Sequence, residues 1–270
     1  MAGCYANPEA LIEPTRLGKH LDDAAVRVIE VGADTRAYAR GHIPGALAWN
    51  WYADLTCPGQ GACIDQPALA RLLARAGVDS ATTVVLYGGS DNRFAAAAFW
   101  LLRYLGFPRV ALLNGGRSAW ERHGWTLVRD IPAYERTVFS LLGPRHEHLR
   151  ATRDRVLGIH DRTCFIDVRM DEEGRGVRLN PDPAAGRRDP GRRWGRIPGT
   201  VHIPWDAAVR EDGSFKPADE LWPIYTQAVA EASEVIVCCL TGACSAHTWF
   251  VLKELLGVRR VRNYDNAWSA

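Results

Sequence analysis

Two adjacent cysteines end an apolar run in the stretch EVIVCCLTGACSAHTWFVLKELLG, residues 234–257. A loop of small residues follows them, and a helical pattern begins near His247. A thiol between the end of a strand and the start of a helix can lie among unpaired backbone N–H groups, at the positive end of the helix dipole. Such surroundings lower the pKa of a thiol and favour the nucleophilic thiolate. We therefore predict that Cys239 is a nucleophile open to small molecules, whereas strand alternation turns Cys238 into the core.

The loop after Cys239 has no charged side chain. Gly242 allows the chain to curl around the sulfur, because a residue without a Cβ adopts conformations that other residues resist. A zinc site built from the loop cysteines and His247 is disfavoured, since adjacent residues on a strand diverge and no Cys-x-x-Cys pair is present. A phosphatase loop is also disfavoured, because the arginine that it needs falls on Ser245. The residues predicted to line a substrate-binding site here are Leu240, Thr241, Gly242, Ala243, Cys244 and Ser245.

The sequence contains a repeat. The stretch TVVLYGGSDNRFAAAAFWLLRYLG aligns without gaps with the stretch described above, at a constant offset of 151 residues. Three further pairs of blocks occur in the same order: VIEVGAD with FIDVRMD, GHIPGALAWNW with GRIPGTVHIPW, and VALLNGGRSAW with VRNYDNAWSA. Gly88 stands at the position equivalent to Cys239. We predict two tandem copies of one domain, residues 1–142 and 150–270, joined near Gly143-Pro144, and only the second copy has the nucleophile.

Each copy alternates short apolar runs with helical patterns. In the first copy RVIEV and TVVLY are expected to be strands, and QPALARLLARAG and FAAAAFWLLRYLG to be helices closed by a glycine. Continuous apolar strands between helices indicate a mainly parallel sheet covered by helices on both faces. The fold class is therefore α/β, in two similar domains. Residues 172–194 form an insert rich in Gly, Pro and Arg, which is either a solvated loop or a source of arginines for an anionic substrate.

Together these blocks resemble the tandem-domain rhodanese family of thiosulfate and 3-mercaptopyruvate sulfurtransferases, and most closely the bacterial thiosulfate sulfurtransferases. The resemblance covers nearly the whole chain and is carried by GHIPGA, GRIPGT, LLNGGRSAW, SAHTWFVLKELLG and VRNYDNAW. It implies a sulfurtransferase that moves a sulfane sulfur from thiosulfate, 3-mercaptopyruvate or a protein persulfide to a thiophilic acceptor. Cys239 would carry the sulfur as a persulfide between two half-reactions.

The resemblance also assigns Arg169, in IDVRMD, to the sulfonate or carboxylate of the donor, a task that suits a planar guanidinium. The alternative for Arg169 is a salt bridge to Asp167 or Asp171. His42 and His247 look structural in this family.

The active loop departs from the pattern of similar bacterial enzymes, which have arginine directly after the nucleophile and again near the end of the loop. Leu240 and Cys244 occupy these positions here, so dianion binding should be weaker. Arg196 replaces the histidine of the second GHIPG block. Cys244 is either a small loop residue or a partner of Cys239 in a disulfide or in persulfide transfer.

The chain of 270 residues has a formal net charge of +2 and seven cysteines at irregular spacing. These values give no reason to expect nucleic acid or a membrane as a partner, and they argue against a secreted disulfide framework. No signal peptide is recognisable, so we expect a cytoplasmic protein. We also expect a monomer that uses no cofactor and no metal. The expected partners are a small-molecule sulfur donor, a thiol or cyanide acceptor, and as an alternative a sulfur-accepting protein. A sulfur-relay protein dedicated to one pathway and a non-catalytic binding protein are the alternative functions.

Overall fold

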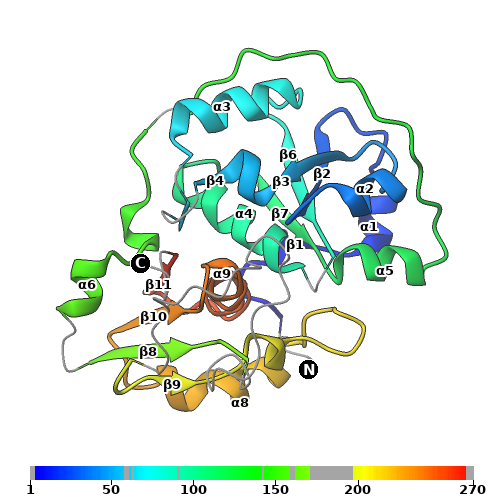
Figure 1. Cartoon of the computed structure of the whole chain (residues 1–270). Helices are drawn as coiled ribbons and strands as arrows, with labels where there is room; N and C mark the ends of the chain where they lie inside the picture. Colours follow the sequence, from blue (N-terminus) through cyan, green and yellow to red (C-terminus); the bar gives the residue numbers. More distant parts are fainter. Residues whose placement is uncertain are drawn as a thin grey trace.

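The structure, a computed structural model, describes residues 4–57, 61–62, 64–89, 92–141, 143–158, 162–170 and 197–265. It has two halves, each built on a parallel sheet (Figure 1). The elements of the first half are β1 (Leu11–Ile12), α1 (Pro14–Gly18), β2 (Val26–Gly32), α2 (Arg36–Arg40), β3 (Leu47–Asn50), β4 (Thr56–Cys57), β5 (Gly61–Ala62), α3 (Gln66–Arg75), β6 (Thr83–Tyr87), α4 (Arg93–Tyr104), β7 (Val110–Leu113) and α5 (Gly116–Arg122). Those of the second half are α6 (Arg153–Leu157), β8 (Thr163–Asp167), β9 (Val201–His202), α8 (Ala218–Val229), β10 (Glu234–Cys238), α9 (Ala243–Phe250) and β11 (Val261–Tyr264).

The sheet of the first half has the strand order β1-β7-β6-β2-β3, and all its neighbouring strands are parallel. Parallel neighbours need crossover connections, which the helices between the strands supply. The central strands β6 and β7 are buried almost along their whole length, which explains why their sequences, TVVLY and VALL, are continuously apolar. A separate short pair, β4 and β5, is antiparallel.

The sheet of the second half repeats this order as β11-β10-β8-β9, again with parallel neighbours. The place that β1 takes in the first half is taken here by Arg150, which forms an isolated parallel bridge with Asn263 of β11. The prediction of two similar α/β domains, each with a mainly parallel sheet, is therefore confirmed.

Helices cover both faces of each sheet. In the first half α1, α2 and α5 pack on one face through Leu17, Tyr38 and Trp120, and α3 and α4 pack on the other. In the second half α8 and α9 share one face, and Val156 of α6 packs with Phe165 on the opposite face.

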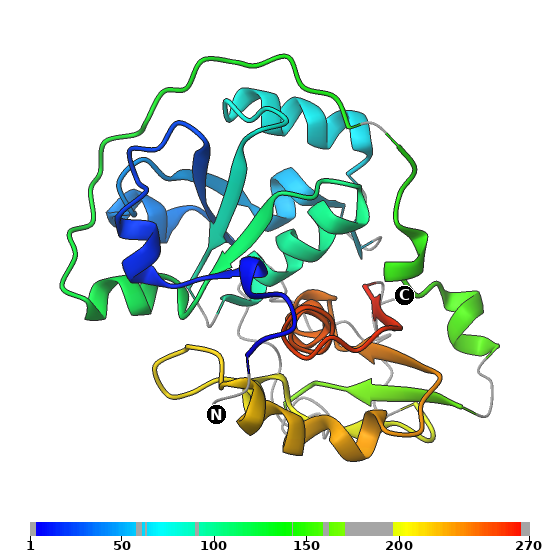
Figure 2. The same cartoon turned by 180° about the vertical axis from the view of Figure 1, so that it is seen from behind.

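The two halves meet through α4 and α9, which lie against each other in the middle of the molecule (Figures 1 and 2). Phe99 of α4 contacts Phe250 of α9 edge to face, with ring centroids 4.9 Å apart, and it also lies 6.5 Å from the Trp249 ring. These two helices are equivalent in the repeat, so the halves face each other about an approximate two-fold axis. Each helix lies between its own sheet and the other helix, which explains why both are apolar nearly all round.

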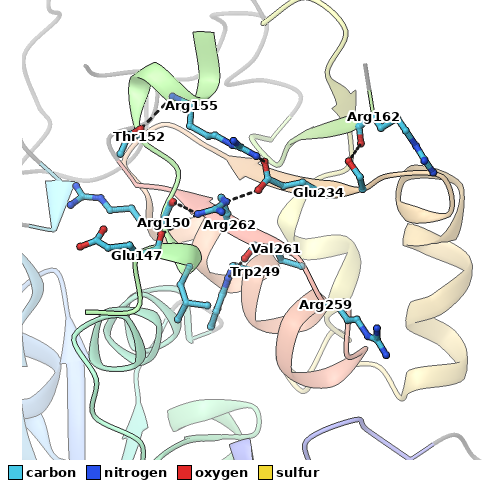
Figure 3. A network of polar contacts seen from close by, with 12 residues as sticks. Glu147, Arg150, Thr152, Arg155, Arg162, Glu234, Trp249, Arg259, Val261 and Arg262 are labelled. Carbon is cyan, nitrogen blue, oxygen red and sulfur yellow. Dashed lines mark hydrogen bonds and ion pairs between the residues drawn. The ribbon is translucent and has the colours of Figure 1, made fainter. Parts of the chain in front are cut away.

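After α5 the chain runs in extended form around the outside of the first half before it enters the second (Figures 1 and 2). The end of this segment, next to α6, is held to the second half by a network of hydrogen bonds and ion pairs (Figure 3). Glu234, at the start of β10, accepts hydrogen bonds from Arg155 at 2.8 Å and from Arg262 at 2.6 Å. Arg262 also donates to the carbonyl oxygens of Glu147 and Arg150. The network therefore ties α6 and the segment before it to the sheet of the second half.

None of the helices in the described ranges combines the length and the apolar character that crossing a bilayer would need.

Candidate active site

Cys239 is the first residue after β10, at the carboxyl end of the sheet, where ligands of open parallel sheets bind. Its side chain belongs to the core that includes α9, whereas Cys238 packs on the opposite face with Ile236 and Tyr264. Burial and the nearby Asp167 carboxylate raise the pKa of Cys238 well above its usual value. The expectation that the two thiols point to opposite faces and that Cys238 is a core residue is confirmed.

The sulfur of Cys239 lies in a cradle of hydrogen-bond donors. The backbone N–H of Gly242 donates to Sγ at 3.1 Å. The Ser245 hydroxyl lies 3.4 Å from Sγ and also donates to the carbonyl oxygen of Gly242 at 3.1 Å. Burial by itself would raise the thiol pKa. Hydrogen bonds from the side chains of Cys244 and Ser245 and from the backbones of Ser245 and Thr241 outweigh this effect and lower the pKa from 9.0 to about 6. Cys239 is therefore mainly a thiolate at neutral pH.

The loop takes this shape because of Gly242, whose φ of +87° lies in the left-handed region. A Cβ at this position would come within 2.7 Å of the backbone oxygen of Asp265. The helix α9 begins directly afterwards, at Ala243, and not near His247 as the sequence pattern predicted. Thus Ala243, Cys244 and Ser245 form the first helical turn, and its N–H groups add to the donors beside the sulfur.

The exposure of Cys239 differs from the prediction of an open thiol, which is wrong for this structure. The residue is only 3% exposed, because α9 and the core between the two halves surround it. Leu240, Thr241 and Cys244 are the half-buried members of the loop, and Gly242, Ala243 and Ser245 are buried. Cys239 therefore presents little exposed surface to a donor molecule in this structure.

Cys244 lies close enough to Cys239 to share a hydrogen bond with it. This bond and burial raise the pKa of Cys244 well above its usual value, so Cys244 keeps its proton and donates to the Cys239 thiolate. Both cysteines are free thiols in the structure. The predicted proximity of the two sulfurs is supported, while a disulfide or sulfur transfer between them stays a prediction.

Arg169 follows β8 and forms a buried pair with Asp167. Its Nε and Nη2 donate to the two carboxylate oxygens at 3.0 and 2.7 Å, and the two residues are 4% and 2% exposed. Burial alone would lower the pKa of Arg169, but the hydrogen bond to Asp167 and its negative charge, assisted by the Cys239 thiolate, raise it. The salt bridge considered from the sequence is thus present, beside the nucleophile, and a contact of Arg169 with substrate stays a prediction.

Two residues near the loop were missed from the sequence. Arg93, the first residue of α4, donates from Nη1 to the sulfur of Cys244 at 3.7 Å, across the interface between the halves. Its guanidinium carbon lies 5.1 Å from the ring centroid of Trp205, which belongs to a short 3₁₀ helix of the second half. The repeat contained a signal for this contact, because the offset of 151 residues makes Arg93 and Cys244 equivalent positions.

His247 is fully buried between the rings of Trp205 and Phe215. Burial, assisted by the positive charge of Arg93, lowers its pKa to about 3, so the imidazole is neutral at physiological pH. This agrees with a structural role rather than proton transfer. His42 is likewise buried, between the carbonyl oxygens of Tyr38 and Asp130.

The equivalent loop of the first half has no thiol, since Gly88 occupies the position. Asn92 fills the centre of this loop instead. Its Oδ1 accepts from the N–H of Gly88 at 2.9 Å, and its Nδ2 donates to the carbonyl oxygen of Leu113 at 2.6 Å. A neutral amide thus satisfies the loop that holds a thiolate in the second half.

Within the described ranges, no group of three or more His, Cys, Asp and Glu side chains is placed to hold a metal ion. The insert at 172–194, Asp171 and Arg196 lie outside the described residues, so the predictions about them stay predictions.

Comparison with known proteins gives a consistent family. The model of the Rhodanese-like domain matches residues 13–123 and again residues 152–270. "Sulfur carrier protein TtuD" of Thermus thermophilus is 40% identical over 273 residues, which cover 98% of this chain and 94% of that protein. "Putative thiosulfate sulfurtransferase 1" of Mycobacterium bovis is 38% identical over 270 residues, covering 100% and 95%.

Solved structures share the fold. The crystal structure of SseA from Escherichia coli, which represents the "Rhodanese" fold of 3-mercaptopyruvate sulfotransferases, superposes with a TM-score of 0.74 at 24% identity, over 97% of this chain and 99% of its own. The complex of EanB with ergothioneine gives a TM-score of 0.82 at 20% identity, over 98% of this chain and 68% of its own.

Proposed function

Because the chain belongs to the rhodanese family and contains two copies of its domain, we propose that it is a sulfurtransferase that carries sulfur on Cys239. The observation that supports this most directly is the Cys239 sulfur, held by the Gly242 N–H and Ser245 with a pKa lowered to about 6. A thiolate at neutral pH is the form that attacks a sulfane sulfur. The prediction from the sequence agrees with the names of the relatives.

The reaction follows from the thiolate. With thiosulfate as donor, the electron pair of the Cys239 sulfur attacks the outer sulfur, a new S–S bond forms, and the old S–S bond breaks with its electron pair leaving on sulfite. In the second half-reaction a thiolate or cyanide attacks the outer sulfur of the persulfide, and Cys239 leaves as the thiolate. No net oxidation of the protein occurs, and the lowered pKa makes Cys239 a good leaving group.

The cradle also suits the intermediate. N–H groups aimed at the Cys239 sulfur stabilise negative charge at this position, and a persulfide is also an anion near neutral pH. We propose that the loop residues Leu240 to Ser245 surround the transferred sulfur, and that Arg169, anchored by Asp167, contributes positive charge beside it. The division into an N-terminal domain, 1–142, without a nucleophile and a catalytic C-terminal domain, 150–270, is part of the same proposal.

A second candidate function is a sulfur relay to another protein. The relative named as a sulfur carrier protein favours it, as does the active loop without charged side chains. The two functions share the Cys239 persulfide and differ in the acceptor. The donor is a small molecule or, for a relay, a protein persulfide, and a cytoplasmic location and a monomeric state stay predictions.

The test is whole-protein mass spectrometry after incubation with thiosulfate or 3-mercaptopyruvate. We expect the wild type to gain the mass of one sulfur atom and to lose it again when cyanide or a thiol is added. Cys239→Ser should gain nothing, while Cys4→Ser, which changes an exposed cysteine, should behave as the wild type. Sulfur gain by Cys239→Ser, or none by the wild type with any donor, would contradict the proposal.

A further inference from the structure

The active loop lacks positive charge of its own. From Cys239 to Ala246 it has no charged side chain, and the neighbouring His247 is neutral because burial and Arg93 lower its pKa to about 3. The guanidinium of Arg169 faces the carboxylate of Asp167, so this buried pair has no net charge. Thiosulfate, the carboxylate of 3-mercaptopyruvate and a persulfide are all anions. Transfer of an anion from water into a buried site has a large unfavourable free energy unless a positive charge lies close to it.

The first half places a cation at this loop. Arg93 is half-buried and stands at the start of α4, where this helix packs on α9. Its Nη1 contacts the sulfur of Cys244, which is itself hydrogen-bonded to Cys239. The Trp205 ring supports the guanidinium, with the cation 5.1 Å from the ring centroid.

The repeat explains why this contact forms. Arg93 and Cys244 are equivalent residues of the two copies, and equivalent residues touch only near the axis that relates the copies. The first helical turns of α4 and α9 therefore meet at the active loop. The approximate symmetry brings residue 93 to the active loop, at Cys244, while the first half has no thiol of its own at Gly88.

We infer that Arg93, from the half without a nucleophile, binds the anionic group of the sulfur donor at Cys239 and so determines which donors the site accepts. The inference rests on the proposed function, since it names the residue that binds the donor for that reaction. It predicts that dianionic thiosulfate depends on Arg93 more strongly than monoanionic 3-mercaptopyruvate does. The complete binding site then includes residues from both halves.

The experiment measures anion binding without requiring sulfur transfer. Inorganic sulfate, an unreactive dianion, is titrated against the rate at which iodoacetamide alkylates Cys239, and the concentration that halves the rate is recorded. Loss of a hydrogen bond to a charged group corresponds to a change of about 10- to 100-fold in binding. We expect this concentration to rise by about that factor in Arg93→Ala and to rise far less in Arg93→Lys, which keeps the charge.

Arg103→Ala is the matched control, because it removes an arginine from the other end of α4, where Arg103 donates to the carbonyl oxygen of Pro108. It should leave sulfate protection unchanged. In turnover, Arg93→Ala should raise KM for thiosulfate and leave kcat nearly unaffected. The inference is overturned if Arg93→Ala is protected by sulfate as well as the wild type, or if Arg103→Ala loses as much protection. Failure of the sulfurtransferase proposal has a different signature, namely no sulfur gain by the wild type, and sulfate protection still reports on Arg93 in that case.

Discussion

The hydroxyl of Ser245 should set a large part of the reactivity of Cys239, and Ser245→Ala tests this directly. The lowering of the thiol pKa from 9.0 to about 6 corresponds to about 4 kcal/mol in favour of the thiolate. One hydrogen bond to a charged group contributes about 1.5–3 kcal/mol, or about 1–2 pKa units. Because the hydroxyl lies 3.4 Å from the sulfur, its removal should raise the pKa of Cys239 to about 7–8.

The assay is the rate of Cys239 alkylation by iodoacetamide as a function of pH. Reactivity requires the thiolate, so the rate falls as the pH drops through the pKa of the folded protein. For the wild type we expect a midpoint of about 6, and for Ser245→Ala a midpoint higher by about 1–2 units. The limited access of iodoacetamide to Cys239 reduces the absolute rate in both proteins and does not shift the midpoint of the pH profile.

Ser233→Ala is the control, since the Ser233 hydroxyl is exposed and donates to the carbonyl oxygen of Arg162, far along β10 from the sulfur. Its midpoint should match that of the wild type. If Ser245→Ala also keeps the wild-type midpoint, the hydroxyl does not stabilise the thiolate. The lowered pKa of Cys239 then cannot be explained by the Ser245 side chain.

Three further changes have definite expected outcomes. Gly242→Ala places a Cβ at a φ of +87° and 2.7 Å from the oxygen of Asp265, so urea denaturation should show a loss of about 1–3 kcal/mol in unfolding free energy. His247 has a folded-state pKa of about 3, below its usual 6.5, so its neutral form stabilises the fold above pH 6.5 and this contribution is lost as the pH falls toward 3. Between pH 3 and 6.5, His247→Phe should therefore reduce the slope of unfolding free energy against pH by up to about 1.4 kcal/mol per pH unit. An unchanged slope would contradict the burial of a neutral imidazole. Asp167→Asn leaves the buried Arg169 charge without its carboxylate and should cost about 3–5 kcal/mol in the same denaturation assay, whereas a loss below about 1 kcal/mol would mean that solvent reaches the pair.

The sequence was sufficient to place the nucleophile on the fold. The apolar run EVIVC predicted β10, and the period of a strand predicted that Cys238 and Cys239 point to opposite faces. Both are local properties, and the structure agrees. The repeat predicted that Gly88 takes the place of the cysteine in the first half, which the position of this residue after β6 bears out.

The start of α9 was predicted too late. Small residues between Gly242 and His247 were taken as a loop, because alanine and serine at the start of a helix give no apolar period. In the structure Gly242 already has the left-handed conformation that precedes the first turn. A glycine directly before Ala243 was thus the better indicator of the helix boundary.

The burial of Cys239 and the contact of Cys244 with Arg93 of the first half could not be predicted from the sequence. Both depend on how α4 packs on α9, which is set by many apolar contacts that no single motif specifies. Arg93 lacks a distinctive local pattern, and only its equivalence to Cys244 in the repeat links it to the site. The partner of Arg169 was foreseen as an alternative because Asp167 is two residues away on the same face of the strand end.

The two equivalent loops show how one duplicated structure can serve two purposes. In the second half the N–H of Gly242 binds the sulfur of Cys239, so the loop holds a negative charge. In the first half the N–H of Gly88 donates instead to the neutral amide of Asn92, so this donor is already occupied. The next residue along is Arg93, which reaches across to the other half. The thiolate of the second half and the Arg93 cation of the first half thus both lie near the approximate two-fold axis, where opposite charges attract. If Arg93 binds the donor as proposed, the half without a nucleophile supplies the positive charge that the active loop lacks.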